Sequence, residues 1–177
     1  METVDIYDKN RKRTGKTRLK SETLQPGEYI CIAHVVVFNR MGEMLIQQRT
    51  DDKIDWPGRW DITAGGGGIA GETPAQTAQR ELWEELGIPA DLTGARPALT
   101  VSYDLGFDDY YIVNVDGLSL SDIKCQAEEV KAVQWASMDT ILQMMAEDRF
   151  VRYKEGFIQY LFALKDGGGS YDRPEIR

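Results

Sequence analysis

The chain has 177 residues, 42% of them hydrophobic, and a formal charge of −8 at pH 7. This length and apolar content fit one compact domain and exclude a largely disordered chain. The acidic balance argues against nucleic-acid backbone or anionic lipid as a partner, and no apolar window approaches the roughly 18 residues of a membrane span, so we expect a cytoplasmic protein. Two cysteines, Cys31 and Cys125, are too few for a disulfide framework.

The first 27 residues are predicted to form a strand and a basic segment that pack on the main domain, which we place at residues 28 to 165. The strand lies near Val4 to Tyr7. The basic segment, Lys9 to Lys20, holds seven cations and no acid. Such a run usually lies in solvent, so we expect a turn there; a contact with a substrate phosphate or a partner subunit is the alternative.

Strand signals dominate the next part of the chain. A hairpin, a loop containing Trp56-Pro57-Gly58 and a short strand lead to four consecutive glycines, Gly65 to Gly68. The predicted strands of this part are 29 to 38, 43 to 49 and 60 to 64.

A helix is predicted from Pro74 to about Leu86. Thr73 suits the N-cap, Pro74 the first helical position, and Gln76 completes a capping box. Gly87 follows where a helix commonly ends.

The rest of the chain is typical of an α/β domain, with no internal repeat and no sign of a second domain. Residues 166 to 177 have the composition of a flexible tail. The predicted elements are strands at 97 to 103, at 109 to 115 and near 130 to 135, and helices near 138 to 146 and 152 to 164.

Three glutamates of the first helix, Glu81, Glu84 and Glu85, fall on one arc at spacings i, i+3 and i+4. A solvated acidic face is the common interpretation of such a pattern. Glu81 and Glu85, however, form a like-charge pair that costs a helix roughly 0.2–0.5 kcal/mol, and we expect Arg80 to pair only with Glu84. A cluster of uncompensated oxygens suits a hard divalent cation such as Mg²⁺ or Mn²⁺.

The glycines also satisfy GxGxxG, from Gly66 to Gly71. This pattern is weak evidence for dinucleotide binding, because the second strand and acidic residue that such a fold needs do not follow the helix.

A longer pattern covers the same segment and is specific. With U for an aliphatic residue, the Nudix box reads Gx5Ex7REUxEExGU, and every fixed position matches between Gly66 and Ile88. The chain is therefore identified as a member of the Nudix family. The resemblance implies an α/β Nudix fold, an α/β/α sandwich with a mixed β-sheet between helices.

The resemblance also implies a divalent-metal-dependent hydrolase, using Mg²⁺ or Mn²⁺, that cleaves the diphosphate linkage of a nucleoside diphosphate or of one linked to another group. Its substrate would be a small molecule. The matching positions imply these roles: Glu84 and Glu85 as metal ligands, Glu81 as a ligand or the group that activates water, Gly65 as a carbonyl ligand, Arg80 as the residue that orients a glutamate, Glu72 as a brace of the loop, and Gly66 and Gly87 as structural glycines.

Parts of the chain resemble the isopentenyl diphosphate isomerase branch of the family, including the hairpin end and the segment 55 to 60. That isomerase requires a catalytic cysteine and several histidine ligands. Its cysteine position reads here as Gly65 and a histidine position as Gly67, so we expect no isomerase activity. The one histidine, His34, is either packed in its strand or in contact with substrate.

Six further residues are weaker candidates for substrate binding: Arg49, Trp56, Arg59, Asp109, Tyr111 and Glu129. Asp109, with its neighbour Asp108, could join the metal site or lie in a solvated loop. Glu129, with Glu128, could supply a base or lie in an exposed loop. The aromatic residues could stack on a base, although most aromatic residues in strands belong to the core.

A nucleotide-sensing module that keeps the fold without turnover is the alternative from another functional class. The complete set of glutamates argues against it. The sequence leaves open the nucleoside, the leaving group, the phosphorus attacked and whether the protein forms a homodimer.

Overall fold

The computed structural model describes residues 2–167, so residues 168 to 177 of the predicted tail lie outside the described part. No helix within residues 2–167 is long and apolar enough to cross a membrane.

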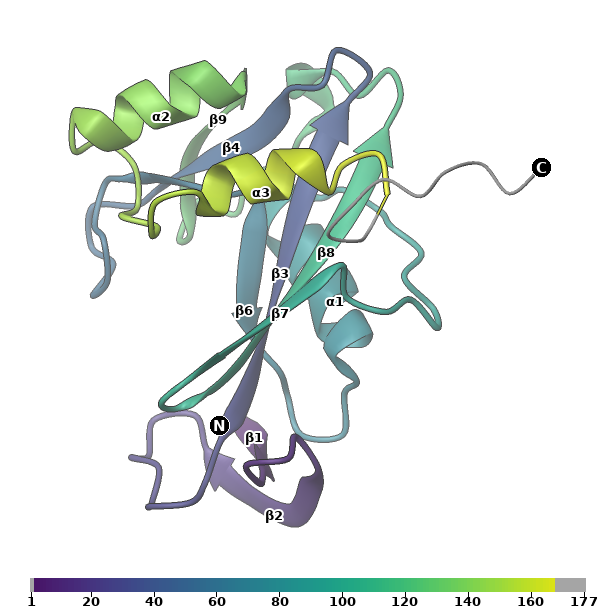
Figure 1. Ribbon diagram of the computed structural model, residues 1–177, viewed down its shortest axis with the longest axis vertical. Coiled ribbons are helices and arrows are strands. Elements are labelled where there is room, and N and C mark those ends of the chain that lie inside the picture. The colour runs from purple at the N-terminus through teal and green to yellow at the C-terminus, as the bar shows by residue number, and fades with distance from the viewer. Residues whose placement is uncertain (1, 168–177) are drawn as a thin grey trace.

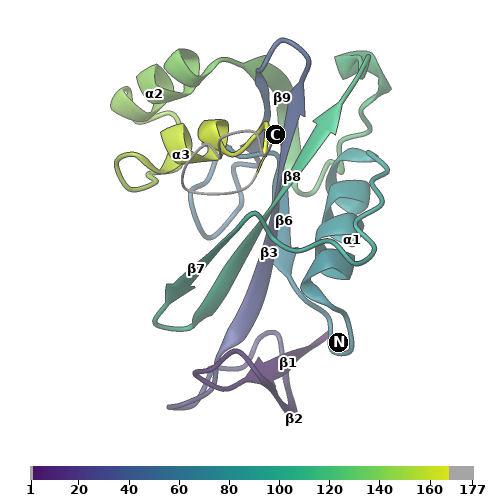
Figure 2. The ribbon, with the colours of Figure 1, turned by 45° about the vertical axis from the view of Figure 1, so that its right-hand side comes forward.

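The protein is a three-layer α/β/α sandwich. Helix α1 (Pro74–Leu86) covers one face of a mixed sheet, while α2 (Met138–Ala146) and α3 (Phe157–Ala163) cover the other (Figures 1 and 2). One apolar core lies under α1 and includes Val35 and Leu82, and a second lies under α2 and α3 and includes Phe38. This architecture confirms the predicted fold class.

The central sheet has seven strands in the order β5-β4-β3-β8-β7, with β6 paired to β3 and β9 paired to β4. Among the strands of residues 2–167, β3 and β8 are the pair that runs parallel, over ten residue pairs. The strands are β3 (Ile30–Asn39), β4 (Met44–Arg49), β5 (Trp60–Asp61), β6 (Ala64–Gly67), β7 (Leu99–Tyr103), β8 (Gly106–Val115) and β9 (Val130–Ala136).

Strands β4 and β6 share one edge of β3. Strand β8 occupies the whole of the other edge of β3. On the shared edge, β4 pairs with β3 at Phe38, and β6 pairs with β3 between Ile32 and Val35. The ends of β4 and β6 therefore lie near each other beneath α1, and this junction positions the site described below.

The basic segment is the predicted solvated turn only over residues 9 to 12, while Arg13–Leu19 form a strand that was not predicted. Strands β1 (Thr3–Tyr7) and β2 (Arg13–Leu19) form a separate two-stranded sheet below the main one (Figure 1). The segment is ordered because its arginines find acceptors: Arg11 pairs with Asp109, Arg13 donates to the Glu72 carbonyl and Arg18 pairs with Glu28.

Several other element boundaries differ from the sequence expectation. The strand predicted at 109 to 115 begins at Gly106, and the one predicted at 97 to 103 begins at Leu99. The strand predicted at 60 to 64 is two strands, because pairing with β3 continues into the glycines of β6. The last helix begins at Phe157 and not at residue 152, since Val151 bonds to Trp60 and Gly156 takes a left-handed φ of 82°. Helix α1 has the predicted bounds.

Candidate active site

The ends of α1 fix how the helix sits on the sheet. Gln76 and Thr73 form the predicted capping box, in which the Thr73 N–H donates to Gln76 Oε1 at 2.8 Å. Gly87 ends the helix with a φ of 65°. Ala75, Ala78, Leu82 and Leu86 form the buried apolar side of the helix. Two of the three glutamates are buried beside it, Glu81 at 8% and Glu85 at 6% exposure. Glu84 is half exposed.

Two of the three glycines in β6, Gly65 and Gly66, lie where side chains of other residues occupy the space of a Cβ atom. A Cβ on Gly66 would lie 2.3 Å from Glu81 Oε1. A Cβ on its neighbour Gly65 would lie 2.5 Å from His34 Nδ1. Gly66 thus admits the Glu81 carboxylate on the α1 face, and Gly65 admits the imidazole on the other.

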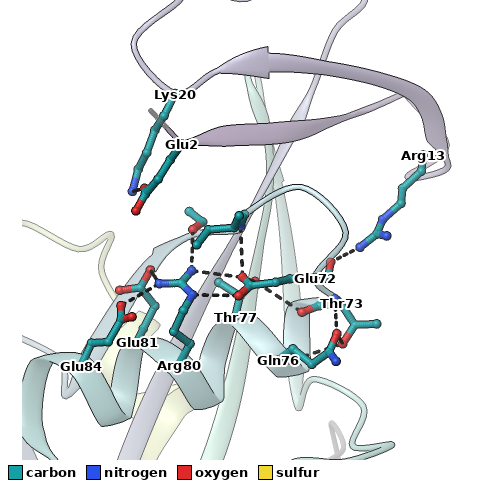
Figure 3. A network of polar contacts seen from close by, with 12 residues as sticks. Glu2, Arg13, Lys20, Glu72, Thr73, Gln76, Thr77, Arg80, Glu81 and Glu84 are labelled. Carbon is teal, nitrogen blue, oxygen red and sulfur yellow. Dashed lines mark hydrogen bonds and ion pairs between the residues drawn. The ribbon is translucent and has the colours of Figure 1, made fainter.

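Arg80 joins the glutamates into one network (Figure 3). Its Nη1 donates to Glu81 and to Glu84, each at 2.9 Å, and its Nε donates to Glu72 at 2.9 Å. The expectation that Arg80 pairs only with Glu84 is wrong, because the guanidinium has enough donors to reach several carboxylates and the Gly67 carbonyl.

Glu72 braces the loop before the helix. Besides Arg80, its carboxylate accepts from the Ile69 N–H at 3.1 Å and from Thr77 Oγ1 at 3.0 Å. Although burial opposes it, the hydrogen bonds from Arg80 and these neighbours lower the pKa of Glu72, so this carboxylate is held ionised.

The pKa values of the two buried glutamates, Glu81 and Glu85, are shifted upwards. Burial, with the Glu81 charge nearby, raises the pKa of Glu85 to about 8, even though Gln47 Nε2 donates to it at 2.7 Å. Burial also raises the pKa of Glu81, against the attraction of Arg80. Without a further positive charge, both carboxylates are costly to ionise.

The network opens on a cavity of about 490 Å³ between α1, β6, the end of β4 and the N-terminal hairpin. Six acidic and four basic side chains line it, so the wall carries an excess of acids. The acidic residues are Glu2, Asp55, Glu81, Glu84, Glu85 and Glu129, and the basic residues are Lys20, Arg49, Lys53 and Arg80.

The lining fits a divalent metal ion in its donor chemistry. Gly65 and the three box glutamates offer only oxygen ligands, two of the carboxylates are buried, and the excess of acids favours a cation. Within residues 2–167 no three acidic, histidine or cysteine side chains are already gathered as ligands. Arg80 donates to one oxygen of Glu81 and to one oxygen of Glu84, which leaves the second oxygen of each carboxylate for an ion.

The N-terminal hairpin contributes Lys20 and Glu2, which the sequence analysis did not name as site residues. They form an ion pair of 3.2 Å and point towards Glu81 (Figure 3). The Lys20 side chain passes 3.7 Å from where a Gly67 Cβ would lie. The only signal in the sequence was the basic run, whose alternative interpretation was a phosphate contact.

Two of the six weaker candidates line the cavity, namely Arg49 and Glu129. Glu129 forms an ion pair with Lys53, a lysine that the sequence analysis missed. Burial, with Arg49 nearby, lowers the pKa of Lys53.

The other four candidates lie away from the cavity. Trp56 packs against Arg59, whose guanidinium lies 5.3 Å from the ring centre. Arg59 itself pairs with Asp148. Asp109 is fully buried, where it accepts from Thr100 Oγ1 at 2.6 Å and pairs with Arg11, and Tyr111 is buried in the core under α1.

His34 lies on the face of the sheet opposite α1. Its ring stacks on Tyr110 with centroids 4.6 Å apart, and its Nε2 lies 3.7 Å from Asp108 Oδ1. It is packed in its strand and paired with one acid.

Comparison with known proteins agrees with this geometry. The family model described as NUDIX domain matches residues 30–160. The chain is 40% identical over 166 residues to an "Uncharacterized Nudix hydrolase" of Listeria monocytogenes, covering 94% of this chain and 96% of that one. It is 32% identical over 157 residues to an isopentenyl-diphosphate Delta-isomerase of Pectobacterium atrosepticum, covering 85% and 86%.

A solved structure, DR0079 from Deinococcus radiodurans, has a TM-score of 0.70 at 18% identity and covers 90% of this chain and 97% of that chain. This likeness shows that the fold is shared. With the matched domain and the relatives, it establishes that the chain belongs to the Nudix family.

Proposed function

We propose that this protein is a Mg²⁺- or Mn²⁺-dependent hydrolase that cleaves the diphosphate linkage of a nucleoside diphosphate, free or joined to another group. The observation that carries the proposal is the cavity, in which three glutamates of α1 face lysine and arginine side chains from other elements. Such a lining suits a substrate that is itself multiply negative and arrives with a divalent cation.

The basic residues would bind and orient the diphosphate. Lys20 comes from the end of the N-terminal hairpin, Arg49 from the end of β4 and Lys53 from the following loop. Each has an acidic partner in the cavity wall or beside it, so a phosphate can replace one charge-assisted contact with another.

The metal would be held by Glu84, by Glu85 and by the Gly65 carbonyl, while Glu81 is kept for proton transfer. When bound, a divalent ion neutralises diphosphate charge and lowers the pKa of a coordinated water. Arg80 keeps Glu81 and Glu84 aligned through its contacts of 2.9 Å to both, with Glu72 holding the guanidinium from the other side.

Glu81 is the group we assign to accept the proton of the attacking water. It is buried against Gly66, and burial makes its carboxylate a better proton acceptor than an exposed one. Glu129 is the second candidate, and it lines the same cavity, paired with Lys53.

Two relatives' names suggest different activities, a Nudix hydrolase and an isopentenyl-diphosphate Delta-isomerase. The residues favour hydrolysis for this chain, because the isomerase cysteine position is Gly65 and His34 is the only histidine in the sequence. The complete set of glutamates favours turnover over nucleotide sensing.

A panel assay tests the proposal. The purified protein would be incubated with Mg²⁺ or Mn²⁺ and with nucleoside diphosphates, dinucleoside polyphosphates and nucleoside diphosphate sugars, and the products would be separated by chromatography. We expect cleavage at a diphosphate bond of at least one compound, abolished by chelator. Tight nucleotide binding with no product from any compound would instead support the sensing module.

A further inference from the structure

Arg49 is the second arginine of the cavity wall, and two contacts to protein atoms hold its side chain. Its Nε donates to the Asp55 carbonyl at 3.0 Å, and its Nη1 lies 3.6 Å from Asp61 Oδ2. Within the described residues its Nη2 has no protein partner. The guanidinium is therefore held on one side, and its other side is available to a ligand.

Asp61 is itself held in a fixed orientation. Its Oδ1 accepts from the Ile62 N–H at 2.8 Å and from the Tyr153 hydroxyl at 2.7 Å. These two bonds occupy one carboxylate oxygen and leave Oδ2 directed at Arg49.

Tyr153 is anchored in the layer on the far face of the sheet. Its ring stacks on Phe157, with centroids 5.3 Å apart and planes 11° apart, and contacts Phe150, which is fully buried. A continuous set of polar contacts therefore runs from the core under α3, through Tyr153 and Asp61, to Arg49 at the cavity.

We propose that Asp61 is a positioning residue that holds Arg49 towards the diphosphate, with Tyr153 fixing Asp61 in turn. The proposal rests on the proposed function, since it assigns Arg49 a phosphate oxygen as ligand. Neither Asp61 nor Tyr153 lines the cavity, so both act through Arg49.

The physical reason is preorganisation. Arginine has many rotamers, and a guanidinium already fixed in its binding orientation loses less entropy when it binds phosphate. Asp61 could also have the opposite effect, by competing with phosphate for the guanidinium of Arg49. The two roles predict opposite signs when the Asp61 charge is removed.

The test measures the affinity of the whole protein for inorganic diphosphate with Mg²⁺ by titration calorimetry, which needs no turnover. The variants are Asp61→Asn, Tyr153→Phe, Arg49→Gln and the double variant Asp61→Asn/Arg49→Gln. Asp116→Asn, which breaks an exposed pair with Arg40, and Tyr160→Phe serve as matched controls.

We expect Arg49→Gln to weaken binding by about tenfold, since a hydrogen bond to a charged group is lost. Asp61→Asn should weaken it roughly threefold to tenfold and Tyr153→Phe less, by loss of preorganisation. The double variant should match Arg49→Gln, because Asp61 has no effect once Arg49 is absent. The controls should match the parent.

Equal or tighter binding by Asp61→Asn would overturn the proposal, and so would an equal weakening in the Arg49→Gln background. If Asp61→Asn does not fold, Tyr153→Phe decides, because it keeps the carboxylate and the ring and removes one hydroxyl. If the parent protein does not bind inorganic diphosphate, the proposed role of Arg49 is wrong. A parent that binds it and hydrolyses no compound of the panel overturns the proposed function alone.

Discussion

Gly66 and Glu81 are in direct contact across the boundary between β6 and α1: the carboxylate fills the space where a side chain at position 66 would begin. The glycine of the family motif is thus required by the packing of a glutamate, and any larger residue must displace that glutamate.

The first prediction follows from this contact. Gly66→Ala should lower kcat by at least about 10²-fold, since displacing a catalytic group by an ångström has an effect of that size. Gly67→Ala is the matched control, because its Cβ would meet Lys20 at an ordinary 3.7 Å. Steady-state kinetics on the best substrate of the panel would compare them. An equal loss of kcat in the two variants would show that the position of Glu81 does not depend on the absence of a side chain at Gly66.

The second prediction concerns Glu81 itself. Glu81→Gln keeps the size of the side chain and removes its ability to take up a proton, so turnover should fall by about 10²–10⁴-fold. Circular dichroism and the melting temperature should change little. A near-normal kcat would move the base elsewhere, with Glu129 tested next.

The third prediction links stability to metal at Glu85. Burial and the nearby Glu81 raise the pKa of Glu85 to about 8, so folding at neutral pH carries the cost of protonating this carboxyl. Glu85→Gln removes that cost, and the metal-free variant should melt at the same temperature as the parent or higher. Its activity should be lost.

Added Mg²⁺ or Mn²⁺ should raise the melting temperature of the parent, because the folded state alone binds the ion, and should raise that of Glu85→Gln much less. Thermal melts with and without chelator measure both effects. A clear destabilisation of the metal-free variant would make Glu85 a structural residue and contradict the assignment.

The fourth prediction concerns isomerisation. The protein should form no dimethylallyl diphosphate from isopentenyl diphosphate, and Gly65→Cys should not create this activity. The reason is steric as well as chemical, since a Cβ at position 65 would lie 2.5 Å from His34 Nδ1. Product analysis by mass spectrometry would decide, and detectable product from the parent would refute the prediction.

The fifth prediction tests the contact between the N-terminal hairpin and β8. In Arg11→Gln the buried Asp109 loses its positive partner and keeps the hydrogen bond from the Thr100 hydroxyl. The free energy of unfolding should therefore fall by about 1–3 kcal/mol. The double variant Arg11→Gln/Asp109→Asn should recover part of this loss, because no charge is left unpaired. Urea denaturation measures all three proteins. Unchanged stability of Arg11→Gln would mean that the hairpin is held by its other contacts.

The sequence was informative wherever local chemistry determines structure. Thr73, Pro74 and Gly87 specify the two ends of α1 by local hydrogen bonding and backbone conformation, and the helix has the predicted bounds. Regular spacing then placed the glutamates of α1 on one side. Because that side meets the glycine strand, two of them are buried, which the spacing alone did not show.

Contacts between segments that are far apart in the sequence could not be predicted from the sequence. Arg11 meets Asp109, Lys20 meets the glycine loop, and Asp61 meets Tyr153, each across a long stretch of chain. No local pattern specifies such a pair. The basic segment looked solvated because its acceptors come from elements that follow it in the sequence.

The parallel pairing of β3 with β8 has a consequence for how the protein folds. Ile30 must meet Gly106 and Asn39 must meet Val115, so the seam in the middle of the sheet closes a loop that contains α1, β4 and β6. Closing so long a loop is slower than forming a hairpin or a helix. Helix α1 and the glycine strand can meet early, because they are neighbours in the chain. The contact between Glu81 and Gly66 is therefore local in the chain, whereas the sheet that carries it depends on the long-range pairing of β3 with β8.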